Sequence, residues 1–279
     1  MNADAALTRP LPAGEPVPLP GKGVPLFSVR NISMVFPAGG NQDGPLRALD
    51  GVDLDVYPGE CLLIAGSNGS GKTLLTRIMA GLLEPSGGAV YYRGRRLARA
   101  IRALRSEAGM VFQDADAQLI GETVLEDAIF GPRNLGFSKT ESEVLARRAL
   151  EAMGLGSKTS HSPRRLSGGE KRRLAVAGAL AMGCETLILD EPFANLDWPG
   201  VTQTLEIIRE LKASGKTLII LTHELEKVLA FADRLVILHQ GRIRDDGAPH
   251  TVLYRLKAEY GVRDPRRVYR TVEDCTWLE

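Results

Sequence analysis

A short glycine-rich stretch constrains this chain more than any other feature of its sequence. Residues 66–73 fit the pattern G-x-x-x-x-G-K-[ST] and stand between an apolar run at 61–65 and a helical pattern at 72–82. Glycines let backbone N–H groups approach a polyphosphate closely, and the N-terminus of the following helix directs its dipole at the anion. The stretch therefore predicts a strand, a loop and a helix that bind the phosphates of a nucleoside triphosphate.

Two side chains of this loop carry the expected chemistry. Lys72 should hold the β- and γ-phosphates, and the Thr73 hydroxyl is placed to bind a Mg²⁺ ion that bridges them. An accidental glycine-rich turn is the alternative, and the strand and helix on either side argue against it. The loop residues expected to contact the nucleotide are Gly66, Ser67, Asn68, Gly69, Ser70, Gly71, Lys72 and Thr73.

The rest of the chain alternates short aliphatic runs with helical patterns, which is typical of an α/β domain with a mainly parallel sheet. Strands are predicted at residues 61–65, 109–112, 186–189, 217–221 and 234–238. Helices are predicted at residues 72–82, 138–153, 168–181 and 200–213.

Two adjacent carboxylates, Asp190 and Glu191, follow the apolar run at 186–189. Asp190 at the end of the strand can bind the magnesium shell, while Glu191 points the opposite way and can polarise a water molecule against the γ-phosphate. An acidic turn after a core strand is the simpler interpretation of the pair alone. A phosphate-binding loop in the same sheet favours the catalytic interpretation.

A third pattern, LSGGE at residues 166–170, precedes a basic helical stretch. Ser167 can cap that helix, whose N-terminus forms a second site for an anion. A plain capping box with Glu170 at the third helical position explains the same residues without a ligand. Taken alone, the capping box is the better interpretation.

These three patterns, in this order, resemble the ATP-binding-cassette (ABC) ATPases over residues 26 to about 247. The resemblance implies an α/β fold of the P-loop NTPase class that binds ATP and Mg²⁺. It makes residues 66–73 the Walker A loop and 187–191 the Walker B strand. Residues 166–170 then match the signature motif, and residues 195–197 the D-loop.

The resemblance also implies roles for single residues. Gln113 matches the Q-loop glutamine that reaches magnesium and the attacking water. His223 matches the switch histidine that contacts the γ-phosphate and pairs with the catalytic glutamate, although a lone histidine at a strand end is usually structural. Phe36 lies where the family places an aromatic side chain that stacks on adenine.

In this family, signature and Walker residues from opposite subunits sandwich each nucleotide, so the chain is expected to act in a dimer with a second copy or a paralogue. Glu170 stands where glutamine is commoner, and Phe193 and Asn195 replace small residues. These departures remove no catalytic group and affect only fine positioning at the dimer interface. The other residues expected to contact ATP are Thr76, Ser167, Gly168, Gly169 and Asp197.

The segment after the Q-loop glutamine is more specific. Residues 111–120 and 123–136 resemble the ATPases of energy-coupling-factor (ECF) importers, including the cobalt and nickel type. Asp116 and Gln118 match a short helix of that family, while Ala115 stands where proline is typical. The resemblance implies that a transmembrane T component docks near Asp116 and Gln118. A separate integral-membrane S component would bind the solute, so a vitamin and a transition-metal ion both remain open.

The expected organisation is a proline-rich tail at 1–25, an ABC ATPase domain at 26–247 and a small C-terminal extension at 248–279. A helical subdomain is expected at about 114–167. The 35 basic and 34 acidic residues give a net charge of +1, so no nucleic-acid partner is expected. No apolar run approaches the roughly 18 residues that cross a bilayer, so any membrane role is expected to come through a partner. Together with the resemblance to importer ATPases, this implies peripheral attachment to the cytoplasmic face of the cell membrane.

Three other classes of protein are weighed against this interpretation. A non-transport ABC ATPase usually inserts long coiled coils or fuses two cassettes, and this chain has neither pattern. The ATPase of another ABC transporter class would share the chemistry, but residues 113–136 argue against it. A P-loop kinase would leave residues 166–170 and His223 unexplained.

Overall fold

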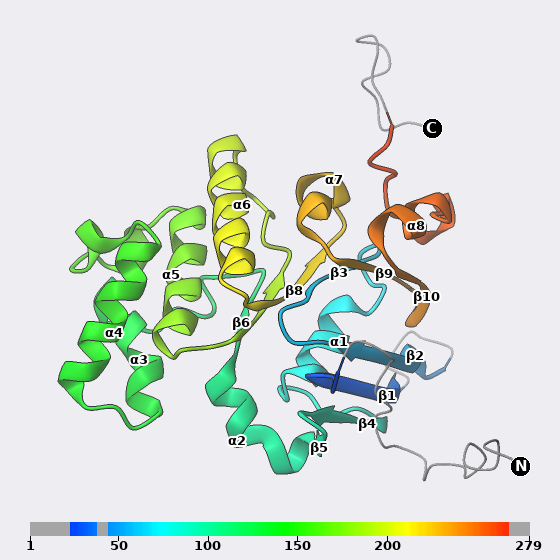
Figure 1. Cartoon of the computed structure of the whole chain (residues 1–279), viewed down its shortest axis with the longest axis horizontal. Helices are drawn as coiled ribbons and strands as arrows, with labels where there is room; N and C mark the ends of the chain where they lie inside the picture. The colour runs from blue at the N-terminus through cyan, green and yellow to red at the C-terminus, as the bar shows by residue number, and fades with distance from the viewer. Residues whose placement is uncertain (1–22, 38–43, 268–279) are drawn as a thin grey trace, which may run out of the picture.

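The computed structural model describes residues 23–37 and 44–267, which form two β-sheets with helices packed around them (Figure 1). One sheet has six strands in the order β10-β9-β3-β8-β7-β6, all parallel except β10 at the edge. Its strands are β3 Cys61–Ala65, β6 Ala108–Val111, β7 Thr186–Asp190, β8 Thr217–Thr222, β9 Arg234–His239 and β10 Arg242–Gly247.

The second sheet is antiparallel, with strand order β2-β1-β4-β5. Register shifts interrupt the pairing of β1 with both of its neighbours, which is where Asn31 adopts a φ of 49°. The strands of this sheet are β1 Phe27–Phe36, β2 Leu46–Val56, β4 Gly87–Tyr92 and β5 Arg95–Arg96.

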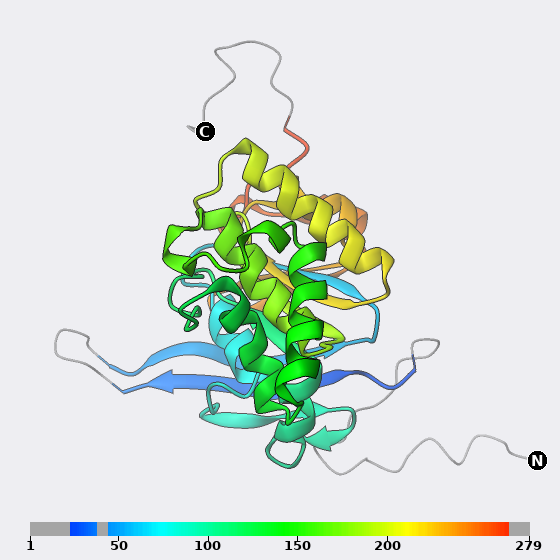
Figure 2. The ribbon, with the colours of Figure 1, turned by 90° about the vertical axis from the view of Figure 1, so that its left-hand side faces the viewer.

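Helices cover the six-stranded sheet, and three of them, α3, α4 and α5, pack together at one end of the molecule (Figure 2). Capping boxes fix the starts of these three helices, at Thr123, Ser138 and Ser167. The helices are α1 Lys72–Met79, α2 Leu97–Glu107, α3 Val124–Asn134, α4 Lys139–Ala152, α5 Gly168–Ala181, α6 Trp198–Ala213, α7 Leu225–Val228 and α8 Pro249–Tyr254.

The six-stranded sheet is buried on both faces. Leu62 and Ile64 of β3 pack in one hydrophobic cluster, with α1, α2 and the antiparallel sheet. Leu63 and Ala65 of the same strand pack in a second cluster, with α3 to α6. Since successive strand residues point to opposite faces, a strand covered on both sides is an unbroken apolar run, which is the pattern that predicted it.

The structure confirms the predicted α/β class, and each of the five predicted strands coincides with a parallel strand to within one residue at either end. The predicted helix at 72–82 ends earlier, at Met79. The elements not predicted from the sequence are the antiparallel sheet, β10, α2, α3, α7 and α8.

The predicted division into tail, domain and extension stays a prediction. Most of the expected tail, residues 1–22, and residues 268–279 of the expected extension lie outside the described residues. Cys61 and Cys184 are free and buried, and burial raises the pKa of their thiols to about 12 and about 11. No helix in the described ranges has the length and apolar character that a membrane span requires.

Candidate nucleotide-binding site

The glycine-rich loop between β3 and α1 requires glycine at two positions. A Cβ on Gly66 would lie 2.1 Å from the carbonyl oxygen of Leu238 on the adjacent strand β9. Gly71 precedes α1 with a φ of 105°, and a Cβ there would lie 2.7 Å from Leu49 Cδ2. No side chain caps α1 and its first turn has no acidic residue, so its N-terminus is suited to an anion.

Lys72 is buried beneath this loop. Its Nζ donates to the carbonyl oxygens of Gly66, at 2.6 Å, and Ser67, at 3.1 Å, and lies 3.7 Å from Oε1 of Glu191. Burial lowers the pKa of the Lys72 ammonium, while the charges of Glu191 and Asp190 act in the opposite direction. The loop therefore holds its cation beside both carboxylates.

Thr73 and Asp190 meet across 117 residues of sequence. The Thr73 hydroxyl donates to Oδ1 of Asp190 at 3.2 Å. Burial raises the pKa of the Asp190 carboxyl, and the nearby charge of Glu191 raises it further, whereas the Thr73 hydrogen bond lowers it. The carboxyl end of β7 thus places an acidic oxygen directly against the first turn of α1.

Glu191 and His223 form a second pair, immediately after the neighbouring strands β7 and β8. Glu191 adopts a φ of 46°, and its backbone N–H donates to the carbonyl of Leu221 at 2.9 Å. The Nδ1 of His223 lies 3.1 Å from both carboxylate oxygens of Glu191. A non-glycine residue with positive φ is uncommon, so the turn holds the buried Glu191 carboxylate at a specific orientation.

These groups surround a pocket of about 340 Å³, a volume within the range of small-molecule sites. Its lining residues are Asn68, Gly69, Ser70, Gly71, Lys72, Thr73, Leu74, Gln113 and Glu191. The structure thus brings most of the predicted loop together with the predicted Gln113 and Glu191.

The donor atoms of the pocket fit a magnesium ion. Thr73 and Asp190 offer two oxygen ligands, and Ser70 Oγ is buried with no hydrogen-bond partner in the described part of the chain. Among the described residues, no group of three or more His, Cys, Asp and Glu side chains could hold a metal ion. Mg²⁺ takes few protein ligands and completes its shell with water and substrate phosphates, which this donor set allows.

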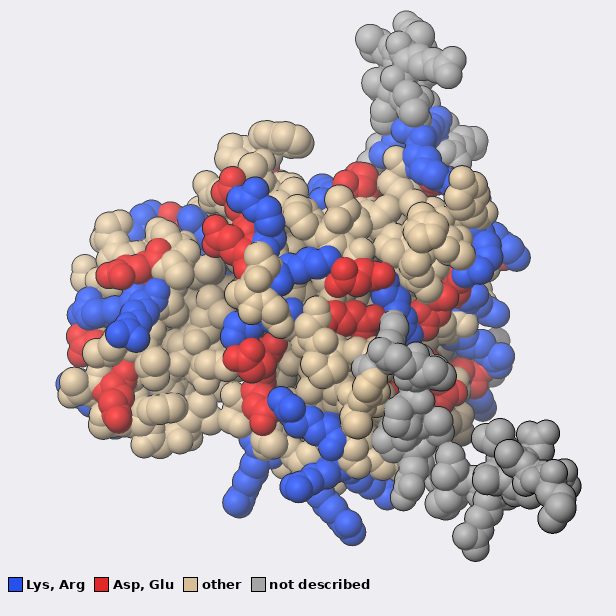
Figure 3. Space-filling model, in the orientation of Figure 1, with Lys and Arg blue, Asp and Glu red and all other residues tan. Residues whose placement is uncertain are grey.

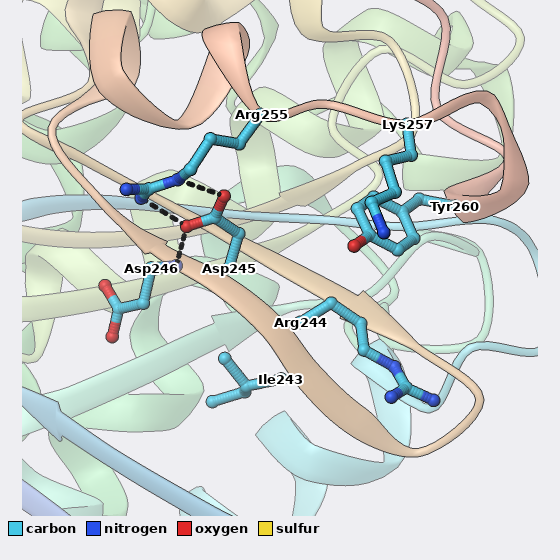
Figure 4. Close-up of a pocket in the computed structure, with 7 residues that line it drawn as sticks. All are labelled: Ile243, Arg244, Asp245, Asp246, Arg255, Lys257 and Tyr260. Carbon is cyan, nitrogen blue, oxygen red and sulfur yellow. Dashed lines mark hydrogen bonds and ion pairs between the residues drawn. The ribbon is translucent and has the colours of Figure 1, made fainter.

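A larger hollow of about 570 Å³ lies elsewhere, between β10 and α8 (Figure 4). Most of its charged side chains are engaged within the chain: Arg255 pairs with Asp245 at 2.5 Å, Asp246 pairs with Arg234 at 2.5 Å, and Lys257 lies over the ring of Tyr260. Because these groups satisfy one another, volume alone does not make this hollow a site.

Ten predicted residues lie outside the pocket lining, and four of them, Gly66, Ser67, Asp190 and His223, bond directly to Lys72, Thr73 or Glu191 in the lining. Ser167, Gly168 and Gly169 begin α5, where Ser167 Oγ accepts from the Glu170 backbone at 3.3 Å. Asp197 caps α6 by accepting from Gly200 N at 3.0 Å. The Thr76 hydroxyl is buried and donates to the backbone of its own helix, at Lys72 and Thr73.

Phe36 also lies outside the lining, at the end of β1 with 37% of its surface exposed. It pairs with Leu46 of β2, two residues before Ala48, whose carbonyl would lie 3.0 Å from a Cβ on Gly71. The ring is therefore exposed at a corner of the antiparallel sheet that adjoins the phosphate loop.

Three contacts of the Q-loop region were not predicted from the sequence. Arg172 of α5 is buried, and its guanidinium donates to the carbonyls of Ala194, at 2.5 Å, and Gln113, at 3.4 Å. Gln118 accepts from Phe112 N at 3.2 Å and donates to Met110 O at 2.8 Å.

The third contact joins Lys171 Nζ to Asp116 Oδ1 at 2.5 Å. The sequence signals these contacts only through the basic residues that follow the LSGGE pattern. A basic residue alone does not reveal which group it will contact.

Comparisons with known proteins agree with this geometry. A family profile described as ABC transporter matches residues 49–194. The chain is 43% identical over 212 residues to the energy-coupling factor transporter ATP-binding protein EcfA1 of Symbiobacterium thermophilum, covering 75% of this chain and 74% of that one. It is 39% identical over 246 residues to the cobalt import ATP-binding protein CbiO of Rhodobacter capsulatus, covering 86% of each.

A solved structure is similar over most of the same region. CbiO1 from Clostridium perfringens, described as part of the ABC transporter complex CbiONQ, matches with a TM-score of 0.71 and 32% identity. The match covers 84% of this chain and 92% of that one. Loop, carboxylate pair, fold and relatives agree, and the chain therefore belongs to the ATP-binding proteins of the ABC transporter family, which bind and hydrolyse ATP.

Proposed function

We propose that this chain is the ATP-hydrolysing subunit of an ECF-type importer for a vitamin or a transition-metal ion such as cobalt or nickel. The observation that carries the proposal is that Gln118 bonds to the backbone of Phe112, the residue before the pocket-lining Gln113, while Asp116 of the same segment pairs with Lys171 of α5. The names of the EcfA1 and CbiO relatives support the same class of transporter. Another class of ABC transporter is the alternative.

Within the pocket, each side chain would have a separate role. Lys72 would bind the β- and γ-phosphates, because its ammonium already lies beneath the loop and beside Glu191. Thr73, Asp190 and Gln113 would hold Mg²⁺, which when bound neutralises charge on the phosphates. Phe36 would stack on adenine from the corner of the antiparallel sheet.

Glu191 would act as the general base for hydrolysis. Its carboxylate is buried, lines the pocket and is oriented by His223 Nδ1, which lies 3.1 Å from both oxygens. A general base oriented by a second group in this way can take a proton from a water molecule aligned with the γ-phosphate. His223 would fix the orientation of Glu191 and contact the γ-phosphate itself.

A second subunit would complete the site. Ser167, Gly168 and Gly169 stand at the exposed N-terminus of α5, outside the pocket of their own chain. The N-terminus of a helix binds anions readily, so these residues would approach a nucleotide held by the opposite subunit. Asp197 would lie at the same interface. Two copies of this chain, or this chain and a paralogue, would then share two composite sites.

The membrane partner would dock beside the Q-loop. A cleft of about 200 Å³ lies there, and its lining includes Phe112, Gln118, Leu82 and Leu104. Leu82 is 53% exposed, which gives the cleft an apolar rim for a helix of a transmembrane T component. A separate S component would carry the solute, and the chain would attach peripherally to the cytoplasmic face of the membrane.

The test is co-purification followed by transport. The full chain, tagged and expressed in its own cells, should retain an integral-membrane partner after mild detergent extraction, and the reconstituted complex should drive ATP-dependent solute uptake. Asp116→Ala should keep ATP hydrolysis while uptake falls at least about tenfold. The control Glu206→Ala removes an exposed carboxylate of α6 and should change neither measurement.

A further variant separates docking from local structure. If Asp116 acted only through its ion pair, Lys171→Ala would reproduce the loss of uptake, because it removes the other half of that pair. Unchanged uptake with Asp116→Ala, or a chain that retains no membrane protein at any stage, would contradict the proposal.

A further inference from the structure

Five arginines form an exposed surface at β5 and α2, which we call the α2 arginine patch: Arg95, Arg96, Arg99, Arg102 and Arg105. All five side chains are exposed. In Figure 3, basic side chains project from the lower edge of the molecule, where Figure 1 draws α2 and β5. The chain as a whole has a net charge of only +1, so this concentration of positive charge is local.

In the part of the chain that the structure describes, no carboxylate pairs with the patch. Within the described residues, none of its five guanidinium groups forms an ion pair or a hydrogen bond. Glu107, the acid at the end of α2, is bound by Arg93 at 2.7 Å and by the hydroxyl of Tyr92 at 2.7 Å. By contrast, Arg47 and Arg242 share the carboxylate of Asp50.

The fold does not account for this arrangement. α2 packs through Ala100 and Leu104, which are buried, and the arginines project from its other side. Several arginines stand three residues apart on the helix, a spacing at which like charges repel. Arg96 is also the N-cap of α2, where the helix dipole disfavours a positive charge. The patch therefore weakens its own helix, and its guanidinium groups gain no ion pair or hydrogen bond within the described chain.

The α2 arginine patch adjoins the cleft proposed for the membrane partner. Arg105 lines the cleft beside Phe112 and Gln118 into which the T component is proposed to dock. The other arginines continue from that cleft along α2, over about 13 Å between Arg96 and Arg105 at 1.5 Å per residue. A membrane protein seated in the cleft would bring lipid headgroups to the same side of the molecule.

We propose that the α2 arginine patch binds the phosphates of anionic lipids at the membrane surface beside the docked transmembrane component. The inference rests on the proposed function, because the membrane is taken as the binding partner on the ground that the chain serves a membrane transporter. A guanidinium group binds phosphate through two parallel hydrogen bonds, and the cytoplasmic leaflet carries a negative surface potential. The small net charge of the chain favours this local contact over a long-range attraction for nucleic acid.

Vesicle binding tests the inference without any membrane partner. The full chain is sedimented with vesicles of phosphatidylcholine alone or with about one third phosphatidylglycerol, at low and high salt. The test variant carries Arg96→Gln, Arg99→Gln and Arg102→Gln. The control carries Arg148→Gln, Arg209→Gln and Arg244→Gln, which remove from α4, α6 and β10 three exposed arginines that form no ion pair with any described residue.

The expected result follows from the strength of each contact. A basic residue near an anionic membrane contributes roughly fivefold in affinity, so the test variant should bind the anionic vesicles about a hundredfold more weakly. The control should bind like the wild type, and high salt should weaken the wild type. Binding to neutral vesicles is expected to be weak for every variant.

Three results would overturn the inference. They are equal binding to both kinds of vesicle, equal loss of binding in the test and control variants, and no binding of the wild type to anionic vesicles at low salt. In the last case, loss of the transmembrane partner by the test variant would instead assign the patch to an acidic protein segment. Because no partner protein is present in this assay, its failure is distinguishable from failure of the proposed transport function.

Discussion

The contact between Thr73 and Asp190 permits a quantitative test, because it joins two groups expected to hold Mg²⁺. Thr73→Val removes the hydroxyl while preserving the branched shape of the side chain. The lost interaction is a hydrogen bond of 3.2 Å to a carboxylate that is only 3% exposed. The change therefore leaves Asp190 buried without the one hydrogen bond that lowers its pKa.

A hydrogen bond to a charged group contributes about 1.5–3 kcal/mol to stability. The distance is long for a hydroxyl donor, so we expect the lower end, about 1.5 kcal/mol. Burial raises the folded-state pKa of Asp190, so ionisation of this carboxyl destabilises the folded state. The loss of stability grows as pH rises from about 4, the pKa of an unfolded aspartate, through the folded-state pKa. Thr73→Val should enlarge it, and destabilise more at neutral pH than at acidic pH.

Urea denaturation of wild type, Thr73→Val, Asp190→Asn and the double variant, at pH 7.5 and pH 4, measures the coupling between the two residues. We expect a coupling of about 1 kcal/mol at pH 7.5, and a smaller effect of Thr73→Val when residue 190 is neutral. Thr73→Ser should retain both stability and the dependence of ATP affinity on Mg²⁺. An equal cost of Thr73→Val at both pH values and in both backgrounds would refute the reasoning.

Three further predictions concern residues around the pocket. Gln118→Leu removes two hydrogen bonds from the end of β6 and should lower the free energy of unfolding by about 1–3 kcal/mol, measured by urea denaturation without a membrane partner. Arg172→Met should change the free energy of unfolding by less than about 1 kcal/mol, because burying the guanidinium is itself costly. The same change should lower kcat about tenfold or more, and an unchanged kcat would exclude a positioning role for Arg172. Phe36→Leu should weaken ATP binding about three- to tenfold in calorimetry, and Phe36→Trp should not.

The parallel sheet could be predicted from the sequence because a strand buried on both faces is a continuous apolar run. The antiparallel sheet could not, since β2 includes Asp50, Asp53 and Asp55 and turns at Gly51 with a φ of 65°. α3 contains Pro132 in its last turn, and a proline inside a helix interrupts the sequence pattern by which a helix is predicted. Both elements are fixed by packing against the core, which local sequence does not reveal.

The candidate site divides in the same way. Residues within one motif, such as Lys72 and Thr73, could be assigned from spacing, because the loop that positions them is local. Gln118 was predicted to meet a membrane partner, and its side chain also ties residues 110–118 together by bonding to Met110 and Phe112. Arg172 gave no specific signal, since its partners are backbone carbonyls of two other loops. Contacts of this kind depend on the assembled fold.

The most direct test of the account is ATP turnover by Glu191→Gln under conditions that permit dimer formation. Removing a general base lowers turnover by about 10²- to 10⁴-fold, while Lys72 and the loop remain able to bind the nucleotide. The control Glu206→Gln makes the same change at an exposed position of α6 and should hydrolyse ATP like the wild type. We predict tight ATP binding with turnover reduced at least a hundredfold in Glu191→Gln, and turnover within a few-fold of the wild type would contradict the account.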